Sequence, residues 1–249
     1  MARILVVYVL VVVALGLTGC GAKWDPKAFN AGAPAGTGFE YRDLPGSDRK
    51  YGVFIPHDYD GTRAYPAVVF LHGLFENGSD PKSSMLVGLG PVVAERKLAA
   101  GYIIVFPQAR SDWRSKDELL LAKRVLEDVK AEYRVDVQRV TLTGVSTGGY
   151  GVWALAQMYP NEFSALVPMA AFDKIEAIPV VKHIPTWIWH NSGDVFVSAG
   201  NAKSMYKGLK AAGADVRMTM NDSRAHNVWV AAYRDPAFWQ WVGEQRRGG

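Results

Sequence analysis

The stretch Arg139-Val140-Thr141-Leu142-Thr143-Gly144-Val145-Ser146-Thr147-Gly148-Gly149 decides the fold, because within it an apolar strand runs directly into an amphipathic helix. A serine at the apex of such a turn is held in strained backbone geometry, and strand and helix nearly touch beside it. Gly144 and Gly148, two residues before and after Ser146, have no Cβ atom and so allow this close approach. The pattern predicts Ser146 as an activated nucleophile.

Two polar segments follow the ends of later predicted strands and offer partners for this serine. An apolar run ending in Trp189-His190 leads into a loop that carries Asp194, and the run Val216 to Met220 leads into a loop that carries His226. In open parallel sheets, active sites lie at the edge where the strands end. The order serine, aspartate, histidine is that of the α/β-hydrolases.

The chemistry of these side chains assigns their roles. Histidine is the side chain that ordinarily titrates near neutral pH, so His226 is the candidate base for Ser146. Asp194 is assigned to orient the imidazole and to stabilise the imidazolium that forms. Asp222, in the same loop as His226, is the alternative acid, although it is equally typical of a solvated turn. The other histidines precede the proposed acid and are expected to be structural: His57, His72, His183 and His190.

Backbone amides close to the serine are expected to stabilise an oxyanion. The helix after Ser146 directs its first unpaired amides and its positive end towards that position, which makes Thr147 N–H one candidate donor. A buried strand from Pro66 to Leu71 ends in His72-Gly73-Leu74, and Leu74 N–H is the second candidate.

These segments resemble the esterase and depolymerase branch of the α/β-hydrolase superfamily. The branch contains feruloyl and acetylxylan esterases, polyhydroxybutyrate depolymerases and peptidases related to prolyl oligopeptidase. The resemblance covers about Gly38 to Arg247. It is carried by the runs Phe70 to Asp80, Phe106-Pro107-Gln108, Arg139 to Trp153, His190 to Asp194, His226 to Trp229 and Tyr233 to Pro236.

The resemblance implies a catalytic triad of Ser146, Asp194 and His226, with the Leu74 and Thr147 amides as the oxyanion hole. It implies a serine esterase that hydrolyses small-molecule or polymer carboxylic esters through an acyl-enzyme. Neither a cofactor nor a metal is expected, because no ligand cluster with metal spacing and no phosphate-binding glycine loop occurs in the sequence. A serine peptidase, or a non-catalytic binding lipoprotein on the same scaffold, is the alternative.

Strand-like and helical segments alternate after the second predicted strand, which indicates an α/β fold: a mostly parallel sheet with helices on both faces in a single domain. One helix is expected after Ser115-Lys116-Asp117-Glu118, which has the pattern of a capping box. The predicted strands are Lys50 to Ile55, Pro66 to Leu71, Tyr102 to Phe106, Arg139 to Thr143, Ala165 to Met169, Thr186 to Trp189 and Val216 to Met220.

The N-terminus has the features of a lipoprotein signal peptide. Arg3 precedes the apolar run Ile4 to Leu17, which is shorter than a typical membrane-spanning helix. The run ends in Leu17-Thr18-Gly19-Cys20, which resembles a bacterial lipobox, and Cys20 is the only cysteine of the chain. We therefore expect a lipid on Cys20 that attaches the protein to the bacterial cell envelope, at the outer membrane if the source has one.

Composition and charge complete the domain organisation. Residues 1–19 are expected to be the signal peptide, residues 20–37 a flexible tether rich in glycine, alanine and proline, and residues 38–249 the catalytic domain. The formal charge of +4 includes Arg3 and is dispersed among acidic residues. Such a distribution does not favour nucleic acid as a partner.

Overall fold

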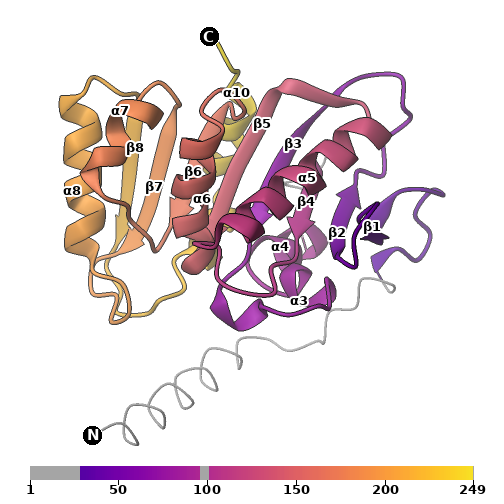
Figure 1. Cartoon of the computed structure of the whole chain (residues 1–249), viewed down its shortest axis with the longest axis horizontal. Coiled ribbons are helices and arrows are strands. Elements are labelled where there is room, and N and C mark those ends of the chain that lie inside the picture. Colours follow the sequence, from indigo (N-terminus) through magenta and orange to yellow (C-terminus); the bar gives the residue numbers. More distant parts are fainter. Residues whose placement is uncertain (1–28, 96–100, 249) are drawn as a thin grey trace, which may run out of the picture.

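One sheet forms the centre of the protein (Figure 1), and the computed structural model describes residues 29–95 and 101–248. Within this part of the chain the sheet has eight strands in the order β1-β2-β4-β3-β5-β6-β7-β8. Strands β3 to β8 pair in parallel, whereas β1 and β2 are antiparallel at one edge. The strands are β1 (Gly38–Asp43), β2 (Lys50–Ile55), β3 (Tyr65–Leu71), β4 (Ile103–Pro107), β5 (Val135–Val145), β6 (Ala165–Met169), β7 (Thr186–Asn191) and β8 (Val216–Asn221).

Helices cover both faces of the sheet, and α5 and α6 cross in front of it in Figure 1. Side chains of α5, α6, α7 and α8 join one hydrophobic core, while those of α3, α4, α9 and α10 join a second core. The helices are α3 (Lys82–Met85), α4 (Leu89–Glu95), α5 (Lys116–Glu132), α6 (Thr147–Met158), α7 (Ile178–Val181), α8 (Ala199–Ala211), α9 (Trp229–Arg234) and α10 (Pro236–Glu244), with short 3-10 helices η1 (Leu74–Glu76) and η3 (Ile175–Ala177).

Alternation along the strands explains why two cores form. In β3, Val69 and Leu71 belong to the core beneath α5 and α6, whereas Val68 and Phe70 belong to the opposite core. Successive side chains of a strand point to opposite faces of a sheet, so a strand that is apolar at every position must be covered on both sides. The sequence of β3 thus requires helices on both faces of the sheet.

The predicted α/β-hydrolase fold and its single domain are confirmed. The structure adds β1, whose alternating burial pairs it with β2 at the antiparallel edge, and it extends β5 back to Val135. Helix α5 begins after Ser115 as expected, but the Ser115 side chain makes no cap hydrogen bond. Glu118 is instead buried, and it pairs with Arg49 at 2.5 Å. The capping box is therefore not formed, because Glu118 bonds a different part of the protein.

Packing extends before the predicted domain start at residue 38. The ring of Phe29 lies 5.3 Å from that of Phe39, and the side chain of Asn30 bonds both the N–H and the carbonyl of Phe39. The predicted signal peptide, Cys20 and residues 20–28 of the predicted tether lie outside the described residues. In the described ranges, no helix has the length and apolar character needed to cross a membrane.

Candidate active site

Ser146 lies in the tight turn between β5 and α6, with backbone angles φ 55° and ψ −117°. A positive φ is unfavourable for a serine, and the turn is fixed by the bond from Ser146 N–H to the Met169 carbonyl at 3.0 Å. A Cβ atom added to Gly144 would lie 2.4 Å from the Gly148 carbonyl oxygen, and one added to Gly148 would lie 2.0 Å from the Leu71 oxygen. Both glycines are therefore required by the close approach of strand and helix.

The structure brings Ser146, Asp194 and His226 together from the ends of β5, β7 and β8. His226 Nε2 lies 2.8 Å from Ser146 Oγ, and His226 Nδ1 lies 2.7 Å from Asp194 Oδ2. With a proton on Nδ1 donated to the carboxylate, Nε2 is free to accept the proton of the serine hydroxyl. This arrangement activates a serine for attack on a carbonyl carbon.

The environment of Asp194 fits it to orient the histidine. Its side chain is fully buried, and Oδ1 accepts hydrogen bonds from the amides of Phe196 and Val197 at 2.9 and 3.0 Å. Burial raises the pKa of Asp194, but the bonds from His226 and from the two amides outweigh it and hold the pKa below its usual value. Asp222 is exposed and bonds the hydroxyl of Ser192 at 3.3 Å. Geometry therefore favours Asp194 over Asp222 as the acid.

The two candidate oxyanion donors border the same cavity as Ser146. Leu74 begins η1 after the two residues that follow β3, and Thr147 is the first residue of α6. Among the described residues, neither amide has a protein acceptor, so both are available to a bound ligand. Their placement at a helix start and at a strand end suits the stabilisation of negative charge beside Ser146.

Two of the histidines that were expected to be structural, His72 and His190, are buried close to the site. Ala109 N–H donates to His72 Nε2 at 3.0 Å, so the His72 proton resides on Nδ1, which bonds the Gly73 carbonyl at 2.7 Å. Burial lowers the pKa of His72 to about 4. His190 Nε2 bonds the Val197 carbonyl at 3.0 Å, and burial lowers its pKa as well. These contacts are consistent with neutral rings that fix neighbouring loops.

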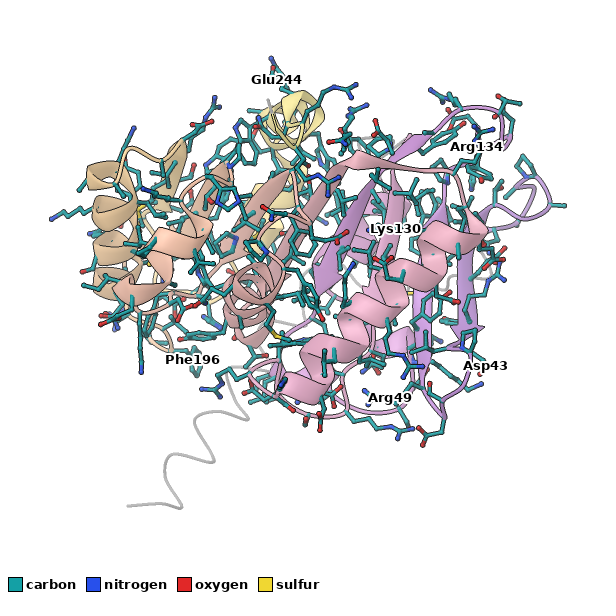
Figure 2. All side chains as sticks on the ribbon, turned by 45° about the horizontal axis from the view of Figure 1, so that its top comes forward. Asp43, Arg49, Lys130, Arg134, Phe196 and Glu244 are labelled. Atoms are coloured by element: carbon teal, nitrogen blue, oxygen red, sulfur yellow. The ribbon has the colours of Figure 1, made fainter. Side chains whose placement is uncertain are left out.

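A cavity of about 700 Å³ opens at Ser146 and is walled mainly by apolar side chains. Phe196 and Trp229 hold His226 between them, with ring centroids 5.3 and 5.5 Å away. Figure 2 places Phe196 at the end of the sheet opposite Glu244. Trp229 and Tyr150 also line the cavity. Phe196 was missed, although its position two residues after Asp194 was a usable signal.

The cavity also contains one acidic side chain that the sequence analysis did not single out. Glu76 lines the wall beside the candidate oxyanion loop, and a Cβ atom added to Gly73 would lie 2.9 Å from its Oε2. Burial raises the pKa of Glu76 despite the nearby amides of Gly73 and Glu76 itself. Trp113 is fully buried and donates its indole N–H to the His72 carbonyl at 2.9 Å.

Residues 43–232 match the model of the Esterase family, described as "Putative esterase". The poly(3-hydroxyalkanoate) depolymerase C of Paucimonas lemoignei is 28% identical over 120 residues, which cover 42% of this chain and 27% of the relative. A bifunctional acetylxylan esterase/xylanase of Neocallimastix patriciarum is 22% identical over 160 residues, which cover 62% of this chain and 23% of the relative. The chain thus spans about a quarter of the length of these curated relatives.

A solved structure of a thermostable esterase superposes with a TM-score of 0.75 and is 27% identical. The match covers 84% of this chain and 63% of that chain. The family match over residues 43–232 includes Ser146, Asp194 and His226.

Proposed function

We propose, from the premise that this chain belongs to the Esterase family, that it is a serine hydrolase of carboxylic esters with Ser146 as its nucleophile. The observation that carries the proposal is the hydrogen-bonded series from Asp194 through His226 to Ser146, with distances of 2.7 and 2.8 Å. The cavity beside Ser146, with the unpaired amides of Leu74 and Thr147 on its wall, supports it further.

The reaction proceeds in two stages. In the first, Ser146 Oγ bonds to the ester carbonyl carbon while its proton passes to His226 Nε2. The oxyanion accepts hydrogen bonds from Leu74 and Thr147, and the C–O bond to the alcohol breaks as His226 returns the proton to the leaving oxygen. In the second, His226 removes a proton from water, whose oxygen attacks the acyl carbon, and the acid leaves as Ser146 regains its proton.

The cavity supports an ester with at least one apolar group. Its wall is mainly apolar, and two relatives carry the names of a polyhydroxyalkanoate depolymerase and an acetylxylan esterase. Both a small ester and a chain end of a polymer are therefore included in the proposal. A peptidase with the same three residues differs in that His226 must protonate a leaving amine, so the leaving group distinguishes the two activities.

The experiment is turnover by the purified protein of a panel that contains nitrophenyl esters, feruloyl esters, acetylated sugars and aminoacyl anilides. We expect hydrolysis of one or more esters, with activity lost in Ser146→Ala. Hydrolysis of anilides alone would assign a peptidase. No turnover of any substrate, together with no labelling of Ser146 by a fluorophosphonate, would favour a binding protein.

Attachment to a bacterial cell envelope through a lipid on Cys20 is also part of the proposal. It is supported by the short apolar run that ends in Leu17-Thr18-Gly19-Cys20. We expect Cys20→Ser to move the protein from the membrane fraction to the soluble fraction. Mass spectrometry that finds an unmodified Cys20 in protein extracted from membranes would contradict it.

A further inference from the structure

The loop that carries the Leu74 amide is not held in place by its own packing. None of the three residues of η1 is buried, and Leu74 and Phe75 are 48% and 68% exposed. The bond inside this turn joins Asn77 N–H to the Leu74 carbonyl at 3.3 Å, and Gly73 provides no side-chain cap. A donor that stabilises an oxyanion must be fixed before the reaction, so other residues have to hold this turn.

Gln108, directly after β4, forms hydrogen bonds with this turn. Its side chain is buried, and Nε2 donates to the Glu76 carbonyl at 2.6 Å and to the Ala109 carbonyl at 3.1 Å. The Gly78 carbonyl lies 3.4 Å from the same nitrogen. Because carbonyl oxygens only accept hydrogen bonds, the Gln108 side-chain amide can bond this loop only with its NH2 group towards them.

The residue after Gln108 holds the loop at both of its ends. Ala109 N–H bonds His72 Nε2, and His72 Nδ1 in turn bonds the Gly73 carbonyl, which belongs to the same peptide group as Leu74 N–H. The Ala109 carbonyl accepts from Gly78 N–H at 2.9 Å. The direction of the Leu74 amide is therefore set by the position of Gln108 and Ala109.

Gln108 is itself fixed by a buried ion pair. Arg49 Nη2 donates to the Gln108 carbonyl at 2.9 Å and pairs with Glu118 of α5. Glu118 Oε1 also accepts from the amides of Arg110 and Ser111, both at 3.1 Å. This explains why Glu118 does not complete a capping box. The loop after β4 is thereby joined to the long helix α5, which gives the η1 turn a rigid support.

We infer that Gln108 is a positioning residue that sets the direction of the Leu74 amide in the oxyanion hole. The inference rests on the proposed function, in which Leu74 N–H is an oxyanion donor. It gives a role to the Phe106-Pro107-Gln108 segment, which carried part of the family resemblance. Gln108 does not line the cavity at Ser146, and it acts through the bond to Glu76 and through the neighbouring Ala109.

The test replaces Gln108 with methionine, which keeps the length and removes the donor. The control is Gln157→Met, because Gln157 on α6 likewise donates its amide, to the Trp153 carbonyl at 3.1 Å and to Asp173 Oδ2 at 2.6 Å. With protein titrated by a fluorophosphonate to count active sites, we expect kcat for a nitrophenyl ester to fall about 10- to 100-fold in Gln108→Met, with KM within about 3-fold. Deleting one oxyanion donor outright costs about 10²- to 10³-fold, and a misdirected donor should cost less.

A second measurement does not depend on activity. In the 1H–15N spectrum, we expect the Leu74 amide signal to shift and its hydrogen exchange to accelerate in Gln108→Met, while Gln157→Met leaves both unchanged. A kcat per active site within 3-fold of wild type, or an unchanged Leu74 amide, overturns the inference. If the wild-type protein hydrolyses no ester but the Leu74 amide still shifts in Gln108→Met, the positioning role stands and the proposed function is refuted. The two failures are therefore distinguishable.

Discussion

Replacement of Asp194 by asparagine should place the His226 proton on the wrong nitrogen. In the native side chain, Oδ2 faces His226 Nδ1 while Oδ1 accepts the amides of Phe196 and Val197. The asparagine oxygen is the only atom of its amide that can accept these two bonds, so its NH2 group must face Nδ1. The imidazole then accepts at Nδ1 and carries its proton on Nε2, towards Ser146.

Those bonds set part of the magnitude, and the remainder comes from loss of the carboxylate charge that stabilises the imidazolium. At roughly 1 kcal/mol each, the two amide hydrogen bonds favour this orientation of the asparagine by about 2 kcal/mol, or about 30-fold. A histidine in the wrong tautomer cannot take the serine proton, and the corresponding change in another serine–histidine–aspartate triad lowers kcat on the order of 10⁴-fold, or about 5 kcal/mol. We expect a loss of that order in Asp194→Asn.

The assay is single-turnover acylation and steady-state hydrolysis of a nitrophenyl ester, together with 15N spectra that report the His226 tautomer. Asp222→Asn is the control, because exposed Asp222 bonds Ser192 at 3.3 Å, and its kcat should stay within about 3-fold of wild type. A loss below 10-fold in Asp194→Asn, or a larger loss in the control, would refute the reasoning.

Two further predictions concern the pH dependence of stability and the cavity mouth. Burial lowers the pKa of His72 from 6.5 to about 4, so as the pH falls the unfolded chain takes up a proton before the folded protein does. The free energy of unfolding therefore decreases as the pH falls from 6.5 to 4, by about 3 kcal/mol at pH 4. Urea unfolding should therefore show a shallower pH dependence in His72→Asn than in wild type, and equal curves would contradict this. Phe75 lines the cavity and is 68% exposed, so Phe75→Ala should raise KM about 5- to 30-fold for a decanoyl ester but little for an acetyl ester, through lost apolar contact. An unchanged ratio of the two KM values would show that the ring does not touch the acyl group.

Local patterns were enough to predict the fold, because the strands that form its centre are apolar on both faces. The predicted bounds of β2 and β6 agree with the structure, and those of β3 and β4 differ by one residue. β1 was missed because Glu40, Arg42 and Asp43 are charged and at least partly exposed, so this segment lacks the continuous apolar run of the central strands.

The sequence also brought together the three residues of the proposed triad, since each follows a strand that ends at the same edge of the sheet. The cavity wall was less predictable. Phe196 lies in a loop and Glu76 in the short helix η1, and neither segment has a periodicity that would predict its place. They are held by hydrogen bonds, from the Phe196 amide to Asp194 in the same loop and from the Gln108 amide to the Glu76 carbonyl. Glu118 shows the same limit, because a helix-start pattern could not reveal that Arg49, far away in sequence, would bind it.

Reaction of the protein with a fluorophosphonate tests the central claim most directly, since this probe requires an activated serine beside an oxyanion hole. Peptide mapping by mass spectrometry should find the adduct on Ser146, and Ser146→Ala should abolish labelling while keeping the fold by circular dichroism. An adduct on another serine, or labelling that persists in Ser146→Ala, would contradict the assignment of Ser146 as the nucleophile.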